Sequence, residues 1–243
     1  MRADHGSGRR PLVAIDGPSG AGKGTVARAV AARLGYRHID TGAMYRAVAW
    51  KALEERLDLD DEAAVAELAR RVRIEVGDGV ARVDGHDVAA AIRTPEIDAA
   101  ASRVARLPRV RDVLIAQQRA LGRAGGVVME GRDIGSVVFP DAGVKIYLDA
   151  AAEERARRRA QDPAHATGRS GAAVSEVASA LEARDHRDRT RAASPLVVAP
   201  DAIIIDTTGL PIAEVLERVM AVVQRQTSAP LLRSRPPEGG RHE

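Results

Sequence analysis

Short apolar runs alternate with longer segments of helical periodicity along most of the chain. The runs have the character of buried strands and cover residues 11–16, 37–39, 127–130, 144–148 and 202–206. The intervening segments repeat apolar residues at helical spacing over residues 23–34, 43–56, 97–106, 109–122, 151–160 and 211–226. Strands that alternate with helices predict a parallel sheet covered on both faces. We therefore expect an α/β fold of three layers, with a five-stranded parallel sheet flanked by helices.

Residues 58–100 break this alternation. A helix with an acidic start is predicted over 58–70, and residues 73–76 and 80–83 then alternate polar and apolar side chains around Gly77-Asp78-Gly79. Alternation on both sides of a glycine-containing turn predicts a β-hairpin, and a third short strand is expected at 87–88. The stretch therefore predicts a small inserted subdomain of antiparallel strands and helices.

The rest of the chain fits one domain over residues 11–226. Its core is predicted from residues 11–57 and 101–226, with a lid over about 158–173 where hydrophobicity is low. The polar ends, 1–10 and 227–243, are expected to be disordered tails.

Composition narrows the choice of ligands. The 243 residues carry a net charge of +3 and include no cysteine, which excludes disulfides and fits a reducing cytoplasm. No apolar run approaches the ~20 residues that cross a bilayer. Positive charge favours polyanionic ligands, but aromatic side chains, on which single-stranded nucleic acids stack, make up only 2% of the chain. We expect a cytoplasmic monomer that binds small phosphorylated ligands, without a membrane or nucleic-acid partner.

A glycine-rich stretch between the first strand and the first helix has the spacing of a phosphate-binding loop. Gly17, Gly22 and Lys23 fulfil G-x-x-x-x-G-K, although Gly24 stands in place of the usual hydroxyl residue and Thr25 follows it. Glycines allow successive backbone N–H groups to point at an anion, and the helix N-terminus adds its positive end. A turn that binds nothing is the alternative, and the flanking strand and helix argue against it.

Two further polar motifs follow predicted strands, Asp40-Thr41-Gly42 and Gly131-Arg132-Asp133. Ligands bind beyond the carboxyl ends of parallel strands, so we expect both motifs beside the phosphate loop. Guanidinium groups pair with phosphate oxygens, and arginines recur in or near these regions at Arg46, Arg111, Arg132, Arg158, Arg184 and Arg191. Any one of them alone fits a solvated surface charge, but together they indicate two phosphorylated ligands.

No histidine stands in a catalytic motif. This fits a nucleoside monophosphate as acceptor, because its phosphate, with a second pKa of about 6, is already largely ionised near neutral pH. Such an acceptor needs no general base, and positioning with charge neutralisation can supply the catalysis. The basic run at residues 155–159 is interpreted either as a solvated helix face or as a lid that closes arginines over the phosphoryl group.

Six motifs together resemble the bacterial cytidylate kinases, a branch of the nucleoside monophosphate kinases. They are I-D-G-P-S-G-A-G-K-G-T, D-T-G-A-M-Y-R-A, L-P-R-V-R, E-G-R-D-I-G-S-V-V-F-P, V-K-I-Y-L-D-A and R-D-H-R-D-R-T-R-A-A-S-P-L. The first motif indicates only a P-loop kinase, whereas E-G-R-D-I-G with R-D-x-x-D-x-x-R is specific to the cytidylate branch. The resemblance spans residue 12 to about residue 226, but the stretch 161–173 matches no motif.

The resemblance implies transfer of the γ-phosphoryl group of ATP to CMP or dCMP, with Mg²⁺. It assigns the ATP phosphates to Gly17, Pro18, Ser19, Gly20, Ala21, Gly22, Lys23, Gly24 and Thr25, and a metal contact to Thr25. It assigns the acceptor to Thr41, Tyr45, Arg46, Ser102, Arg111, Arg132, Asp133, Arg184, Asp188 and Arg191. Within this set Arg46 and Arg132 would hold the CMP phosphate, Ser102, Arg111 and Asp133 the cytosine, and Arg184 and Asp188 the ribose. Catalysis would fall to Lys23, Arg132, Arg158 and Arg191.

Two other functions fit parts of the sequence. A P-loop kinase for UMP or a hydroxylated metabolite would share the loop, and a hydroxyl acceptor would make Asp16 or Asp40 a candidate base. A basic regulator that uses ATP to control contact with nucleic acid would instead show steeply salt-dependent binding.

Overall fold

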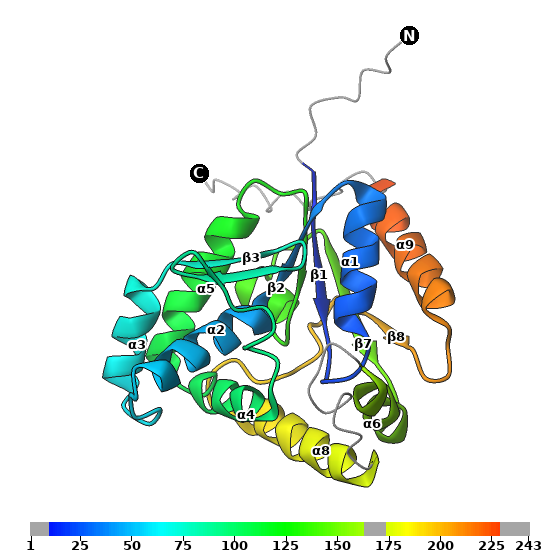
Figure 1. Ribbon diagram of the computed structural model, residues 1–243. Helices are drawn as coiled ribbons and strands as arrows, with labels where there is room; N and C mark the ends of the chain where they lie inside the picture. The colour runs from blue at the N-terminus through cyan, green and yellow to red at the C-terminus, as the bar shows by residue number, and fades with distance from the viewer. Residues whose placement is uncertain (1–9, 163–173, 229–243) are drawn as a thin grey trace, which may run out of the picture.

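The computed structural model describes residues 10–162 and 174–228. Its centre is a five-stranded sheet with the order β2-β6-β1-β7-β8, in which every neighbouring pair is parallel (Figure 1). The strands are β1 (Leu12–Asp16), β2 (Arg37–Asp40), β6 (Val127–Glu130), β7 (Val144–Asp149) and β8 (Ile203–Asp206). The predicted five-stranded parallel sheet is therefore confirmed, with the glycine-rich loop after its central strand.

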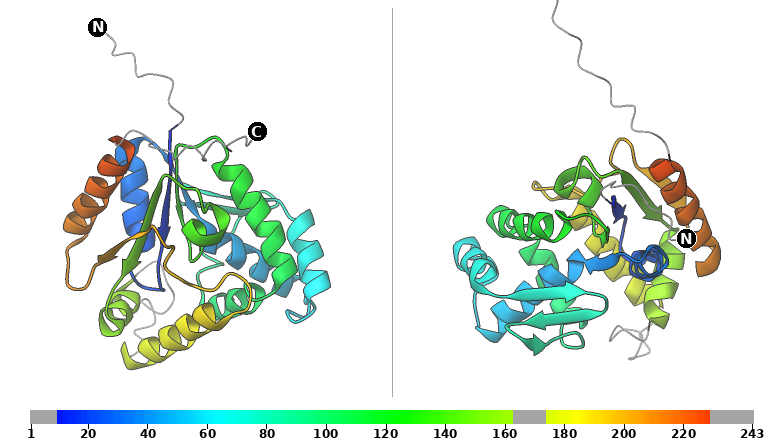
Figure 2. Two further views of the ribbon diagram at one scale, coloured as in Figure 1. Left: turned by 180° about the vertical axis from the view of Figure 1, so that it is seen from behind. Right: turned by 90° about the horizontal axis from the view of Figure 1, so that it is seen from above.

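Helices cover both faces of this sheet (Figure 2). Val13 and Ile15 of β1 pack with α1 (Lys23–Leu34) and α9 (Ile212–Ser228). The alternate residues Leu12 and Ala14 face α5 (Pro108–Gly122) and a π-helix, η1 (Ile134–Val138). Alternation along a strand thus feeds two separate apolar layers, and the three-layer prediction is confirmed.

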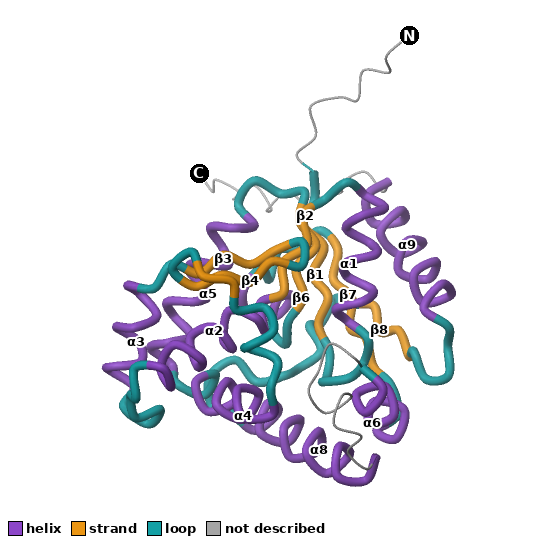
Figure 3. The backbone as a smooth tube through the Cα atoms, viewed as in Figure 1, coloured by secondary structure: helices purple, strands orange, loops and turns teal. Residues whose placement is uncertain are grey.

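A second, smaller sheet lies beside this core (Figure 3). It is antiparallel, in the order β3 (Ile74–Gly77), β4 (Val80–Val83) and β5 (His86–Asp87). Its apolar side chains join a core shared with α2 (Thr41–Glu54), α3 (Glu62–Arg71), α4 (Pro95–Val104) and α5. The hairpin predicted around Gly77-Asp78-Gly79 is confirmed, but its turn has only two residues because Gly77 belongs to β3. Asp78 and Gly79 both adopt positive φ, as a two-residue hairpin turn requires.

Two helices complete the carboxyl edge of the large sheet. They are α6 (Ala152–Gln161) and α8 (Val174–Thr190), joined by a small apolar cluster of Ala156, Val177 and Leu181. In Figure 1, α8 lies below the ends of the strands, and one of its ends reaches α4. Among the described helices, none combines the length and apolar character needed to cross a bilayer.

Several predicted boundaries are wrong. Asp40-Thr41-Gly42 is not a loop, because α2 begins at Thr41 and the Asp40 carboxylate caps it by accepting from the Ala43 N–H at 3.0 Å. The helix predicted from residue 58 begins at Glu62, with Asp61 as its cap. The last helix continues to Ser228, two residues into the expected tail. The π-helix after β6 was not predicted.

Other predictions fall on residues outside the described ranges. Residues 1–9, 163–173 and 229–243, which hold most of both expected tails and most of the expected lid, are not described. Of the lid residues, 158–161 belong to α6.

Candidate active site

A cleft of about 570 Å³ opens at the carboxyl edge of the large sheet. The phosphate loop after β1 forms one side, and α4, α5, the segment after β6 and α8 contribute the other. The motifs that follow three different strands therefore meet at one place, as the parallel sheet predicts.

The phosphate loop is a turn whose backbone conformation requires glycine at three positions. Gly17, Gly20 and Gly22 have φ of 146°, 81° and 87°, a region that side chains with a Cβ rarely adopt. A Cβ at Gly17 would collide with the carbonyl oxygen of Leu148, so this glycine is also fixed by packing against β7. Lys23 begins α1 and its Nζ donates to the Pro18 carbonyl at 2.7 Å across the loop.

The loop is held from outside by charged side chains of α6 and α8. The Ser19 N–H donates to the Asp185 carboxylate at 3.2 Å, and Arg155 pairs with Asp185 while donating to the Ser19 carbonyl at 3.0 Å. Arg159 donates to the Ser19 hydroxyl at 2.9 Å. The sequence predicted no role for Asp185, and it placed Arg155 and Arg159 only in the basic run at 155–159. Their contacts with Ser19 were not predicted, because each spans more than 130 residues in sequence.

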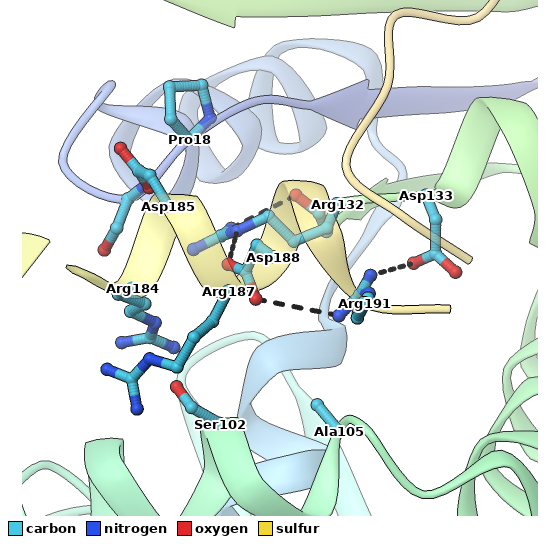
Figure 4. Close-up of polar contacts among 12 residues, drawn as sticks. Pro18, Ser102, Ala105, Arg132, Asp133, Arg184, Asp185, Arg187, Asp188 and Arg191 are labelled. Carbon is cyan, nitrogen blue, oxygen red and sulfur yellow. Dashed lines mark hydrogen bonds and ion pairs between the residues drawn. The ribbon is translucent and has the colours of Figure 1, made fainter. Parts of the chain in front are cut away.

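The opposite side of the cleft is a chain of alternating charges (Figure 4). Arg132 Nε donates to Asp188 at 3.1 Å, and Asp188 also faces Arg191 at 3.7 Å. Arg191 lies 4.0 Å from Asp133, which forms an ion pair with Arg111. Arg111 is fully buried and stacks over the Tyr45 ring at 5.4 Å. The arrangement fixes the orientation of Asp133 and of three guanidinium groups.

Asp40, at the end of β2, organises a second group of arginines. Its carboxylate pairs with Arg46 at 2.8 Å and with Arg93 at 3.7 Å. Burial alone would raise the pKa of Asp40, but the charges of Arg46 and Arg93 and the Ala43 N–H outweigh it and lower this pKa to about 2. Asp40 therefore stays ionised and paired with these two arginines, which makes it poorly suited to accept a proton as a base.

Asp16, the other candidate base, is also occupied. Its two carboxylate oxygens accept the N–H groups of Ile134 and Gly135 at 2.9 and 2.7 Å, which fixes the start of η1. Burial raises its pKa to about 6, against the lowering effect of those two hydrogen bonds. Both carboxylates that a hydroxyl acceptor would require are committed to structural contacts.

The cleft contains unsatisfied cationic hydrogen-bond donors. Five of its arginines carry a buried side-chain nitrogen without a hydrogen-bond partner among the described residues: Arg46 Nε, Arg111 Nε, Arg159 Nη1, Arg184 Nε and Arg191 Nη2. Buried donors are rarely left unpaired in folded proteins. Anionic ligands with several oxygen acceptors match this set of donors.

The charged side chains of the cleft also affect the pKa of Lys23. Burial and the charge of Arg132 lower its pKa, and Glu130 and Asp16 oppose them. Glu130 is itself held by a buried contact with His38, whose Nε2 lies 2.9 Å from Glu130 Oε1. Sequence reasoning assigned no role to His38 because nothing in the pattern of β2 marks it as a partner of β6.

Most predicted site residues line this one cleft. They are Ser19, Gly20, Gly22, Lys23, Gly24, Thr25, Thr41, Tyr45, Arg46, Ser102, Arg111, Arg132, Asp133, Arg158, Arg184, Asp188 and Arg191. Gly17, Pro18 and Ala21 are buried behind the loop surface and do not line it. Arg158 reaches the cleft, but its guanidinium donates to Thr207 and Glu154. The sequence did not predict Arg93, which pairs with Asp40, or Asp98, which pairs with Arg184.

The protein offers few ligands of its own for Mg²⁺. Within residues 10–162 and 174–228, no three carboxylate or imidazole side chains converge as a metal site. Thr25 is exposed in the cleft at the start of α1 and offers one oxygen. This donor set fits a magnesium ion that brings most of its oxygen ligands with it, as phosphates and water do.

The central parallel sheet, the phosphate loop after β1 and the cationic cleft define the class of P-loop kinases. Residues 13–225 match the cytidylate kinase family, and the chain belongs to that family. The expected resemblance is confirmed over the range in which it was found.

Individual relatives agree with this assignment. The cytidylate kinase of Solibacter usitatus (strain Ellin6076) is 48% identical over 220 residues, which cover 90% of this chain and 95% of the relative. The cytidylate kinase of Desulfitobacterium hafniense (strain Y51) is 47% identical over 227 residues, covering 91% and 96%. A bifunctional pantoate ligase/cytidylate kinase of Synechococcus sp. (strain JA-3-3Ab) is 47% identical over 225 residues, covering 90% of this chain and 41% of its own length.

Proposed function

We propose that this protein transfers the γ-phosphoryl group of ATP to CMP or dCMP, giving ADP and CDP or dCDP. The observation that carries the proposal is the cleft, where a phosphate loop faces a cluster of arginines with unsatisfied donors. Membership of the cytidylate kinase family supports the choice of acceptor. The predicted enzyme is a phosphotransferase whose acceptor is itself a phosphate group.

The donor side of the proposed site is the loop over residues 17–25. Its N–H groups and the N-terminus of α1 would hold the phosphates of ATP, and Lys23 would neutralise charge on the outer phosphates. Thr25 would supply the protein's contact to Mg²⁺, which when bound would help neutralise those phosphates. Arg158 is proposed as a lid arginine near the transferred phosphoryl group.

The acceptor phosphate is proposed to lie against Arg46 and Arg132, with Arg191 nearby beside Asp188. Each side chain is buried or half-buried and held by a carboxylate, so it is oriented before the ligand arrives. A CMP phosphate oxygen attacks without losing a proton, since it is already ionised near neutral pH. This reaction needs no base. It therefore agrees with the structure, in which Asp16 and Asp40 both accept hydrogen bonds from backbone N–H groups. A hydroxylated metabolite is therefore the weaker candidate.

Cytosine is proposed to be recognised by Ser102, Arg111 and Asp133. The N4 amino group of cytosine is a hydrogen-bond donor, and its N3 and O2 atoms are acceptors. The side chains that recognise cytosine must therefore present an acceptor beside a donor. The Arg111–Asp133 pair presents both, and Ser102 lines the same cleft. Uracil reverses the donor and acceptor at this edge and would leave buried groups unpaired, which discriminates strongly. Tyr45 and Thr41 would complete the pocket, with Arg184 and Asp188 toward the ribose.

Substitution of Asp133 tests both the phosphoryl-transfer reaction and the recognition of cytosine. In wild-type protein with ATP and Mg²⁺, we expect CMP to stimulate ADP release strongly and UMP to stimulate it weakly. Asp133→Ala should lower the rate with CMP and narrow the CMP/UMP ratio of kcat/KM by about tenfold or more, because the acceptor for N4 is lost. Asp201→Ala provides a control, since Asp201 pairs with Lys145 outside the cleft.

An unchanged CMP/UMP ratio in Asp133→Ala would remove Asp133 from base recognition. Absence of CMP-stimulated ADP release in the wild type, together with steeply salt-dependent binding to DNA or RNA, would favour the nucleic-acid regulator instead.

We also propose the remaining features that the sequence predicts. The enzyme acts in the cytoplasm as a monomer, and residues 58–100 form an acceptor-binding insertion within one kinase domain. The absence of cysteine supports the cytoplasmic location, and the small antiparallel sheet supports the insertion.

A further inference from the structure

One aspartate of α4 joins two arginines from two other helices. Asp98 Oδ1 accepts from Arg184 Nη1 of α8 at 3.0 Å, and Asp98 Oδ2 lies 3.9 Å from Arg159 Nη1 of α6. The three side chains are only 14–21% exposed. Helix α8 reaches α4 in Figure 1, and the Asp98–Arg184 contact joins these two helices.

The same network reaches the phosphate loop. Arg159 uses its other terminal nitrogen, Nη2, to donate to the Ser19 hydroxyl at 2.9 Å. A continuous path of polar contacts therefore runs from the loop through Arg159 and Asp98 to Arg184. It connects the two sides of the cleft without crossing the sheet.

Asp98 acts as a counter-charge for both arginines. Burial lowers the pKa of Arg159 to about 10, with Asp98 opposing that shift and Arg184 adding to it. Burial likewise acts to lower the pKa of Arg184, but Asp98, Asp188 and Asp185 outweigh it and raise this pKa. Without the Asp98 charge, two partly buried guanidinium groups that repel each other would lose the carboxylate between them.

Arg184 also retains a donor for a ligand. Its Nη1 is engaged by Asp98, whereas its Nε is buried without a hydrogen-bond partner among the residues described, and the side chain lines the cleft. Holding one end of a guanidinium fixes the direction of its remaining N–H groups.

We propose that Asp98 is a positioning residue that aims Arg184 at the acceptor nucleotide and ties it, through Arg159, to the phosphate loop. The proposal rests on the proposed function, since the acceptor is the nucleotide that Arg184 would contact. Asp98 does not touch the nucleotide itself. Its effect on the acceptor is transmitted by Arg184.

The test uses Asp98→Asn, which keeps the shape of the side chain and removes its charge. We expect the KM for CMP to rise about tenfold, because a charge-assisted hydrogen bond that orients Arg184 is weakened. The KM for ATP should change less than about threefold, because many backbone N–H groups of the loop hold the donor phosphates. Glu96→Gln is the matched control, since Glu96 is an exposed acidic residue in the same first turn of α4. It should leave both KM values within about twofold.

A double-mutant cycle separates positioning from a general structural role. If Asp98 acts through Arg184, Asp98→Asn should add little to the KM increase caused by Arg184→Gln, so the two effects are not additive. Additive effects, or an unchanged KM for CMP in Asp98→Asn, would overturn the proposal while leaving CMP phosphorylation by the wild type intact. Failure of the wild type to phosphorylate CMP would instead overturn the proposed function. Thermal melting of each variant verifies that it is folded before kinetics are compared.

Discussion

At the scale of single residues, Gly17 combines two demands that no other residue type meets. Its φ is +146°, and a Cβ there would collide with the Leu148 carbonyl. We predict that Gly17→Ala lowers the free energy of unfolding by at least about 3 kcal/mol, through backbone strain and overpacking together. Gly35→Ala is the control, because Gly35 has φ of +63° with nothing within 4 Å of the added Cβ. It should cost only about 1 kcal/mol in urea unfolding, and equal losses would contradict the packing role.

Asp16 provides a second prediction at this scale, on pH dependence. Burial raises its pKa to about 6 from an ordinary value of 3.8. The folded chain therefore binds this proton more tightly than the unfolded chain, and the contribution of Asp16 to stability falls as pH rises between about 4 and 6. We expect the wild type to lose more unfolding free energy than Asp16→Asn between about pH 4.5 and about pH 7. A carbon NMR titration of the Asp16 carboxyl with a midpoint below 4 would disprove the shift.

At the scale of elements, hydrophobic periodicity predicted all five strands of the large sheet and the hairpin of the small one. These elements are fixed locally, since alternating or continuous apolar runs and a glycine turn determine them. The start of α2 was predicted too late because Asp40-Thr41-Gly42 has loop composition, although Asp40 is a good N-cap.

The π-helix shows what local pattern does not contain. The N–H groups of Val137 and Val138 both bond to the Asp133 carbonyl, and Asp16 receives the N–H groups at the start of η1. Asp16 is 118 residues from Ile134 in sequence. Because the turn is stabilised by this distant carboxylate, no window of neighbouring residues could have predicted it.

At the scale of the whole molecule, parallel strands bring the functional motifs together. The loop after β1 and the segments after β2 and β6 follow adjacent strands in the sheet, which is why motifs spread over more than 100 residues line one cleft. The sequence was sufficient to predict this convergence and the phosphate loop. It was not sufficient to predict which carboxylate holds which arginine, as with Asp98 or Asp185, because those pairs join helices that only the fold places side by side.

The central claim is that the cleft binds ATP and a cytosine nucleotide together and transfers a phosphoryl group between them. Its most direct test is a panel of acceptors, CMP, dCMP, UMP and AMP, each offered at equal concentration with ATP and Mg²⁺ while ADP release is followed. We predict that the cytosine nucleotides react fastest, with CMP at least about tenfold faster than UMP. A panel in which UMP or AMP equals or exceeds CMP would contradict the claim.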